Sequence, residues 1–330
     1  MIFFKILITG GAGFIGSNLC DFFLARGHRV ACLDNLSTGF KRNIEPFLEN
    51  QNFTFIEGDI RDLQTCLKAT DGVDYVLHQA ALGSVPRSIK DPITSNDVNV
   101  CGFLNMLVAS RDNQVKRFIY AASSSTYGNS PTLPKIENVI GKPLSPYAIT
   151  KYVNELYADV FARIYGMECI GLRYFNVFGQ RQNPDGAYAA VIPLWVKELI
   201  NHQQPLINGN GEYSRDFTYI ANVVEANEKS IFADSEQLKS TEGYINEVFN
   251  VAFGGNTTLN ELFTVLRENL AKYDSSILSI EPIYGPYRSG DIPHSQASIE
   301  KAKELLGYNP QFSAKAGFEL AAEWYWNNIK

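Results

Sequence analysis

The sequence begins with an apolar run that leads directly into a glycine-rich turn. Residues 6–9 are Ile-Leu-Ile-Thr, and Gly10, Gly13 and Gly16 follow at a spacing of three before a helical pattern that continues to residue 26. A strand, such a turn and a helix form the start of a parallel βαβ unit, in which backbone N–H groups at the helix start can approach a pyrophosphate. This opening predicts an α/β protein built around a parallel sheet.

The rest of the first half continues the alternation of strands and helices. We expect strands at residues 29–33, 53–56, 75–79, 117–122 and 169–173, a helix at 62–69 and a long helix at 146–165. This pattern is typical of a doubly wound parallel Rossmann sheet, whose ligands bind beyond the carboxyl ends of the strands. We assign this domain to residues 1–175.

The second half has a mixed pattern, which predicts a smaller α/β domain at residues 176–330 with some interleaving of segments. The polar stretch at 234–243 is expected to be a surface loop. Helices are expected at residues 191–201, 220–232, 259–273 and 299–306, and after residue 313.

Composition excludes several classes of protein. The chain has 330 residues, 45% of them hydrophobic, and a net charge of −6, which argues against a nucleic-acid surface. No apolar stretch approaches the roughly 20 residues that span a bilayer, and the N-terminus has no signal-peptide pattern. Five scattered cysteines and four histidines show no metal-ligand spacing. We expect a cytoplasmic protein that needs no metal and contacts no membrane.

An acidic residue closes the second expected strand. Asp34 stands at the distance at which a carboxylate grips the adenosine ribose of a dinucleotide, and it would repel a 2′-phosphate. This position favours NAD over NADP, although Asp34 could also serve as a turn former. Asp59 and Ile60 after the third strand, and Ala80 and Ala81 after the fourth, could lie along the same dinucleotide.

Tyr147 and Lys151 are four residues apart on the expected long helix. Side chains at this spacing lie on the same face of a helix, so the ammonium can lower the phenol pKa and make Tyr147 a base near neutral pH. Together with the glycine turn, this pair predicts hydride chemistry on a nicotinamide.

These motifs resemble the extended short-chain dehydrogenase/reductase family over essentially the whole chain. The stretch 123–128, Ser-Ser-Ser-Thr-Tyr-Gly, follows the fifth strand, and the resemblance makes Ser123 the catalytic hydroxyl beside Tyr147 and Lys151. Ser124 and Ser125 remain alternatives. The NAD-binding candidates are Gly10, Gly13, Phe14, Ile15, Gly16, Asp34, Asn35, Ser37, Thr38, Gly39, Asp59, Ile60, Gln79, Ala80, Ala81, Asn99, Tyr147, Lys151 and Tyr174.

Three later segments, 172–179, 214–220 and 287–293, resemble the substrate site of UDP-sugar epimerases and related enzymes. The resemblance implies that Arg215 and Arg288 bind the diphosphate and that Asp291 binds the uridine ribose. The substrate-binding candidates are Ser84, Val85, Ser123, Ser124, Asn176, Ala190, Val191, Asn208, Arg215, Arg288, Asp291 and Ser295.

The reaction follows from what the serine stretch lacks. Related dehydratases carry an acidic pair there, because eliminating water needs an acid and a base besides hydride transfer, whereas this chain has Ser124, Ser125 and Thr126. We therefore expect inversion at C4 through a 4-keto sugar, with NAD retained. A UDP-uronate decarboxylase or dehydratase is the enzymatic alternative. An NAD-binding regulator without turnover is the non-enzymatic one.

Segments 79–88 and 176–182 resemble bacterial UDP-N-acetylglucosamine 4-epimerases of polysaccharide and O-antigen pathways. In that family a small residue at the position of Ser295 leaves room for an acetamido group. The resemblance therefore implies UDP-GlcNAc and UDP-GalNAc as substrates, open to their uronic acids, with Ser84 and Val85 near the sugar. It also implies a homodimer.

Overall fold

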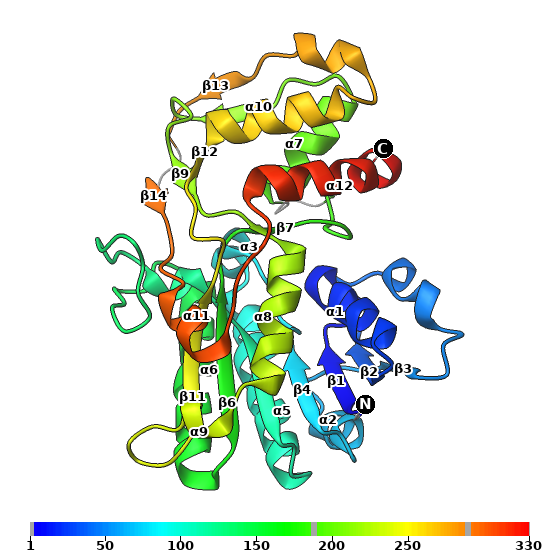
Figure 1. Ribbon diagram of the computed structural model, residues 1–330, viewed down its shortest axis with the longest axis vertical. Helices are drawn as coiled ribbons and strands as arrows, with labels where there is room; N and C mark the ends of the chain where they lie inside the picture. The colour runs from blue at the N-terminus through cyan, green and yellow to red at the C-terminus, as the bar shows by residue number, and fades with distance from the viewer. Residues whose placement is uncertain (1–2, 186–189, 288–291, 330) are drawn as a thin grey trace.

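The computed structural model describes residues 3–185, 190–287 and 292–329, and it is built around one parallel sheet of seven strands (Figure 1). The strand order is β11-β6-β5-β4-β1-β2-β3. Strands β1 to β3 are added toward one edge of the sheet, and β4 and the later strands are added on the other side of β1, so this is a doubly wound sheet. The strands are β1 (Lys5–Thr9), β2 (Arg29–Asp34), β3 (Phe53–Glu57), β4 (Tyr75–His78), β5 (Arg117–Ser123), β6 (Glu168–Tyr174) and β11 (Asn246–Val251).

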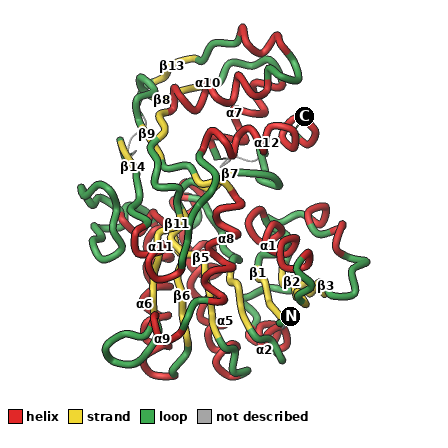
Figure 2. Tube along the Cα trace, in the orientation of Figure 1, coloured by secondary structure: helices red, strands yellow, loops and turns green. Residues whose placement is uncertain are grey.

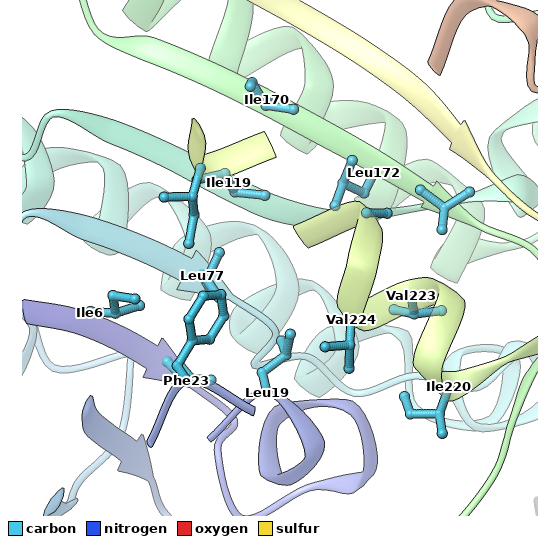
Figure 3. Close-up of a cluster of buried hydrophobic side chains, with 14 of the residues drawn as sticks. Ile6, Leu19, Phe23, Leu77, Ile119, Ile170, Leu172, Ile220, Val223 and Val224 are labelled. Carbon is cyan, nitrogen blue, oxygen red and sulfur yellow. The ribbon is translucent and has the colours of Figure 1, made fainter. Parts of the chain in front are cut away.

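Helices cover both faces of this sheet, and the side chains of each strand alternate between the two layers. Ile6 and Ile8 pack in a cluster with Phe23 and Val223 (Figure 3), whereas Leu7 packs with Phe103 on the opposite face. On the first face lie α1 (Phe14–Ala25) and α8 (Ile220–Phe232), and on the second lie α2 (Leu63–Thr70), α5 (Gly102–Asp112) and α6 (Pro146–Tyr165).

Short helices connect the strands near the carboxyl ends of the sheet. They are α3 (Val85–Lys90), α4 (Pro92–Asn96) and a π-helical turn (Asp97–Cys101) that continues into α5. Ser84 caps α3 and Asp91 caps α4 through side-chain oxygens that accept backbone N–H groups. The sequence pattern had predicted no helix in this stretch.

A second group of elements packs at the carboxyl end of the sheet (Figures 1 and 2). Three of its helices enclose an apolar cluster that contains Trp195, Phe263 and Phe318. The helices are α7 (Val191–Ile200), α10 (Leu259–Leu270) and α12 (Ala314–Asn328). The small sheets pair β7 (Val177–Phe178) with β10 (Thr218–Tyr219), β8 (Leu206–Asn208) with β13 (Ile283–Gly285), and β9 (Ser214–Arg215) with β12 (Thr257–Thr258) and β14 (His294–Ser295).

Two elements from the second half of the chain complete the large sheet layer. β11 pairs with β6, and α8 packs beside α1. Arg117, which is 3% exposed at the start of β5, donates from Nη1 to the carbonyl oxygens of Ser230 (2.7 Å) and Ala233 (2.9 Å), and it pairs with Glu168. Its guanidinium thus holds the C-terminal end of α8 against the sheet.

The predicted fold class is confirmed, and α6 has the predicted bounds because Ser145 caps its start and Gly166 ends it in the left-handed region. The segment at 234–243 differs from a plain loop. Asp234 accepts the N–H of Glu236 and starts the short α9 (Ser235–Leu238). α11 (Glu300–Leu306) lies beside β11. Across the described ranges, no helix has the length and apolarity to cross a bilayer.

Candidate active site

A pocket of about 540 Å³ lies beyond the carboxyl ends of the central strands. It brings together the glycine turn, the acidic end of β2, the serine that ends β5 and the Tyr-Lys pair of α6. The predicted site residues that line it are Gly10, Gly13, Phe14, Ile15, Gly16, Asp34, Asn35, Ser37, Thr38, Asp59, Ile60, Gln79, Ala80, Ala81, Ser84, Ser123, Tyr147, Lys151, Tyr174 and Asn176.

The glycine turn has no room for side chains. Gly10 has a φ of +67°, and a Cβ there would lie 2.8 Å from the backbone nitrogen of Ala80. A Cβ on Gly16 would lie 2.2 Å from the carbonyl oxygen of Gly10. Gly13 caps α1 with no side-chain hydrogen bond, so the N–H groups of the first helical turn remain available to the pocket. This cradle fits the pyrophosphate of a dinucleotide.

The carboxylate of Asp34 is held in place at the end of β2. It accepts the N–H of Ala12 at 3.0 Å and that of Leu36 at 2.8 Å. Burial raises the pKa of Asp34, and these two N–H groups lower it in part. The buried, oriented carboxylate suits two hydroxyl donors of a ribose.

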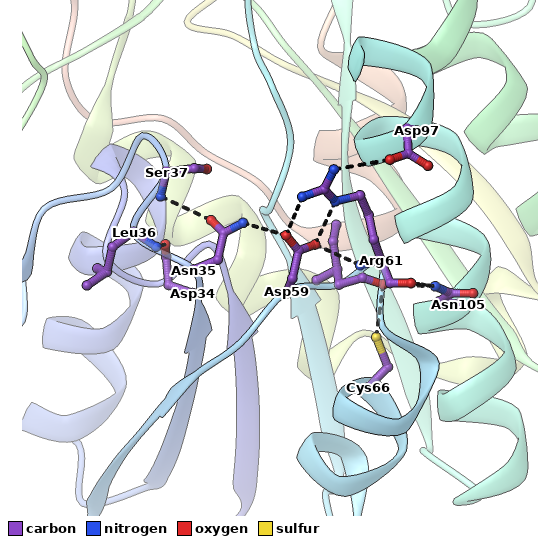
Figure 4. A network of polar contacts seen from close by, with 10 residues as sticks. Asp34, Asn35, Leu36, Ser37, Asp59, Arg61, Cys66, Asp97 and Asn105 are labelled. Atoms are coloured by element: carbon purple, nitrogen blue, oxygen red, sulfur yellow. Dashed lines mark hydrogen bonds and ion pairs between the residues drawn. The ribbon is translucent and has the colours of Figure 1, made fainter. Parts of the chain in front are cut away.

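Asp59 belongs to a neighbouring polar network (Figure 4). Its Oδ2 accepts hydrogen bonds from Asn35 Nδ2 and from Arg61 Nη2, each at 2.8 Å, and Arg61 also pairs with Asp97 at 3.1 Å. Hydrogen bonding to Arg61 lowers the pKa of Asp59 to about 2. This network fixes the far wall of the pocket beyond β2 and β3.

The helix α6 is anchored at its start, where the reactive residues lie. The hydroxyl of Ser145 accepts the N–H of Ala148 at 3.1 Å, and Ser88 Oγ accepts the N–H of Tyr147 at 3.0 Å. Pro146 occupies the first turn, where it needs no hydrogen-bond partner. Tyr147 and Lys151 therefore project into the pocket from a fixed turn.

The three predicted catalytic side chains lie together at the end of β5. Tyr147 is hydrogen-bonded to Ser123, whose Oγ also accepts from the hydroxyl of Ser125 at 2.9 Å. Lys151, 3% exposed, donates from Nζ to the carbonyl oxygen of Ala121 at 2.8 Å. The group lies where a sugar hydroxyl and a nicotinamide could meet.

The electrostatics of this group differ from the expectation that Lys151 lowers the phenol pKa. Burial raises the pKa of Tyr147, and the hydrogen bond with Ser123 lowers it in part. Burial also lowers the pKa of the Lys151 ammonium to about 8. Burial is the largest cause of both shifts, and the ammonium of Lys151 contributes no resolved lowering of the Tyr147 pKa.

Four predicted cofactor and sugar residues, Gly39, Val85, Asn99 and Ser124, do not line this pocket. Asn99, 1% exposed, accepts the N–H of Leu82 at 2.7 Å and donates to Thr150, so it supports the wall from behind. A Cβ on Gly39 would lie 3.0 Å from Asp34 Oδ2, so Gly39 packs on the outside of the carboxylate. Val85 begins α3, and Ser124 begins the 3₁₀ turn Ser124–Tyr127.

The predicted diphosphate and sugar residues lie on the second group of elements. Arg215 of β9 and Ser295 of β14 are register partners on adjacent strands. Asn208 ends β8, Ala190 caps α7, and Val191 is the first residue of α7. Arg288 and Asp291 lie outside the described residues.

Several lining residues were not among the predicted candidates. Leu82, Gly83 and Val98 line the pocket after β4, where the rule that ligands bind beyond strand ends could have found the first two. Gln182 also lines the pocket, but its position in the sequence gives no indication of this. Its buried Oε1 finds no hydrogen-bond partner among the described residues, which fits a ligand donor in the pocket.

The chain belongs to the NAD dependent epimerase/dehydratase family, whose model matches residues 6–252, and its cofactor is NAD. It is 33% identical over 325 residues to the UDP-glucose 4-epimerase of Mycolicibacterium smegmatis, covering 98% of this chain and 99% of that protein. The solved UDP-glucose 4-epimerase of Thermotoga maritima with UDP-glucose is 37% identical, with a TM-score of 0.87 and coverage of 99% and 100%. The UDP-N-acetylglucosamine 4-epimerase of Methanobrevibacter ruminantium in complex with UDP-N-acetylmuramic acid is 36% identical, with a TM-score of 0.88 and coverage of 98% and 99%.

Proposed function

We propose that this chain inverts C4 of UDP-N-acetylhexosamines, interconverting UDP-GlcNAc and UDP-GalNAc and serving bacterial polysaccharide or O-antigen synthesis. The corresponding uronic acids are alternative substrates. The observation that carries the proposal is the convergence of Ser123, Tyr147 and Lys151 in the pocket that also contains the glycine turn. The similar structures are a UDP-glucose 4-epimerase and a UDP-N-acetylglucosamine 4-epimerase. They therefore support inversion at C4 more strongly than the choice of sugar.

The distribution of carboxylates favours epimerisation over elimination. Among the described lining residues, the only carboxylates are Asp34, which ends β2, and Asp59, which follows β3. Ser123 ends β5, which lies on the other side of β1 in the sheet. A dehydratase needs an acid and a base beside the reacting sugar, whereas this wall offers the hydroxyl of Ser123, which accepts a hydrogen bond from Ser125 behind it.

In the proposed cycle, each side chain has one task. NAD bound in this pocket would supply the hydride acceptor for C4 and the hydride donor for the opposite face of the keto sugar. Tyr147 takes the proton of the C4 hydroxyl and gives it back, and Ser123 orients that hydroxyl through its bond with Tyr147. Lys151 holds the nicotinamide ribose, while the glycine turn and Asp34 hold the pyrophosphate and the adenosine ribose.

Substrate choice rests on the second group of elements. Arg215 and Arg288 would bind the diphosphate, and Asn176, Ala190, Val191, Asn208 and Asp291 would lie along the UDP. Ser295, half-buried on β14, would leave space beside the hexose that an aromatic ring would fill. Ser84 and Val85 would approach the sugar from the start of α3.

We also propose that two copies of the chain form a homodimer through α6 and the helices beside it. Ile149 and Leu156 on α6 are 53% and 50% exposed, and Ile93 on the adjacent α4 is 82% exposed. Burying such side chains against a second copy would remove apolar surface from water. Light scattering of the wild type and of Leu156→Glu tests this, since the variant should be a monomer.

The function is tested by a proton NMR time course of the purified protein with UDP-GlcNAc and, separately, UDP-GlcNAcA, without added cofactor. The C4-inverted anomeric signal should grow with at least one substrate, because NAD is retained through turnover. A sugar product that has lost water would indicate a dehydratase instead, and one that has lost carbon dioxide would indicate a decarboxylase. No change with either sugar, even after NAD is added, would favour a binding protein.

A further inference from the structure

Asp216 lies between β9 and β10 and is 1% exposed, yet it does not line the pocket. Its Oδ1 accepts the N–H of Phe253 at 3.2 Å, and its Oδ2 accepts those of Gly254 at 3.1 Å and Ala297 at 3.2 Å. All three donors are backbone groups, and they come from two loops that are distant in sequence. One carboxylate thus joins the loop after β11 to the segment after β14.

The backbone of Asp216 contacts two further residues of the substrate half. Its N–H donates to the carbonyl oxygen of Ser295 at 2.8 Å, and its carbonyl oxygen accepts from Asn176 Nδ2 at 3.2 Å. Arg215, the adjacent residue in sequence, is the register partner of Ser295. Asp216 therefore lies at the point where the residues proposed to bind the sugar nucleotide meet.

Burial of the Asp216 carboxylate removes water from it and so disfavours its charged form. Burial raises the pKa of Asp216 to about 7, and the N–H groups of Ala297, Phe253, Gly255 and Gly254 lower it in part. These donors replace the water that the carboxylate loses. A neutral amide has only one acceptor oxygen, so it could not satisfy the same set.

We infer that Asp216 is a positioning residue that fixes the sugar-nucleotide half of the site, and thereby its selection of the hexose, without contacting the dinucleotide. This inference rests on the proposed function. It assigns Asp216 no part in the chemistry, since it acts through Asn176, Arg215 and Ser295. Among the described residues, neither the glycine turn nor Asp34 is hydrogen-bonded to Asp216, since Asp34 accepts from Ala12 and Leu36.

The test is Asp216→Asn, which keeps the shape and removes one acceptor. The KM for UDP-GlcNAc should rise by about 10- to 100-fold, the range expected for lost charge-assisted hydrogen bonds. The preference for UDP-GlcNAc over UDP-glucose should fall, while kcat changes by less than about threefold. NAD content per subunit and its rate of release on dilution should stay within about twofold of the wild type.

Asp234→Asn is the matched control, because it alters an exposed carboxylate that also accepts a backbone N–H, from Glu236 at 3.0 Å. It should change none of these quantities. Equal losses of NAD retention and sugar affinity in Asp216→Asn would mean general destabilisation, and unchanged KM values would remove Asp216 from this role. A wild type with no turnover of any UDP-sugar would instead refute the proposed function.

A second measurement applies if Asp216→Asn does not fold. Hydrogen exchange of the wild type without ligand should show slow exchange for the amides of Phe253, Gly254 and Ala297, because the carboxylate holds them. Exchange of these three amides at the rate of an open loop would overturn the inference.

Discussion

Arg173 of β6 and Glu155 of α6 form a buried two-point ion pair. Nε lies 2.9 Å from Oε1 and Nη2 lies 2.7 Å from Oε2, and the side chains are 4% and 7% exposed. Arg173 also donates to the carbonyl oxygen of Glu137 at 2.8 Å. The pair thus joins the helix that carries the Tyr-Lys pair to the strand beside β5.

Replacing one partner should destabilise the protein strongly. Glu155→Gln leaves a buried guanidinium without its counter-charge, which typically costs about 3–5 kcal/mol. Asp159→Asn on the same helix breaks an exposed pair with Arg163 and should cost no more than about 0.5 kcal/mol. Urea unfolding of both variants measures the difference, and equal losses would show that burial of the first pair is unimportant.

Tyr147→Phe should abolish most turnover but leave binding intact. A positioned acid/base typically contributes a factor of about 10² to 10⁴, and the phenyl ring keeps the packing of Tyr147. Steady-state kinetics and calorimetric titration with UDP would measure kcat and affinity separately. Tyr152→Phe, on the same helix and outside the pocket lining, is the control. Near-wild-type turnover of Tyr147→Phe would remove this residue from catalysis.

Lys151 should make the stability of the NAD-free protein depend on pH. Its pKa is about 8 in the folded protein and 10.5 ordinarily, so between these values the unfolded chain binds more protons than the folded one. Stability therefore rises with pH across this interval, whereas the full penalty for the buried ammonium is present below about pH 8. At about 1.4 kcal/mol per pKa unit, the penalty is on the order of 3 kcal/mol.

Thermal unfolding of the NAD-free wild type and Lys151→Met at pH 7 and pH 10 would detect this effect. The variant lacks the buried charge, so its stability advantage over the wild type should shrink as pH rises. An advantage that grows with pH would mean that the ammonium is stabilised in the fold.

Ser295→Tyr should change which sugar is accepted. An aromatic ring on β14 would occupy the space proposed for the acetamido group, so kcat/KM for UDP-GlcNAc should fall by at least about tenfold more than for UDP-galactose. A difference of one methylene in the fit of a substrate to its pocket typically changes the ratio of kcat/KM values by about 10- to 200-fold. Equal losses for the two substrates in the same assay would place Ser295 away from the sugar.

The sequence predicted the sheet and the reactive pair because local signals agreed with the final structure. A side chain on Gly10 or Gly16 would clash with backbone atoms of the turn, and Pro146 and Gly166 mark the ends of α6. Each of these signals lies within a few residues of the feature that it predicts. The choice of NAD likewise depended on Asp34, the last residue of its strand.

The rest depends on contacts between distant segments, which a local pattern does not contain. Nothing near Asp216 indicates that its donors are Gly254 and Ala297. The expectation that Lys151 lowers the pKa of Tyr147 also left out the burial of both groups, which is a property of the packed site. Asn99, predicted to bind the cofactor, does not line the pocket and instead supports its wall, a distinction that the local sequence does not contain.

The insertion of β11 and α8 into the first sheet layer has a consequence for how the chain is made. Synthesis proceeds from the N-terminus, and domains commonly fold as they emerge. Here Arg117 cannot bond to the carbonyl oxygens at the end of α8 until residue 233 has been synthesised. Likewise, β6 cannot pair with β11 until residue 251 has been synthesised. A nascent chain that already carries the glycine turn and the Tyr-Lys pair would thus still expose the edge of β6. Until β11 has been synthesised, this exposed edge is where a chaperone would protect the chain from aggregation.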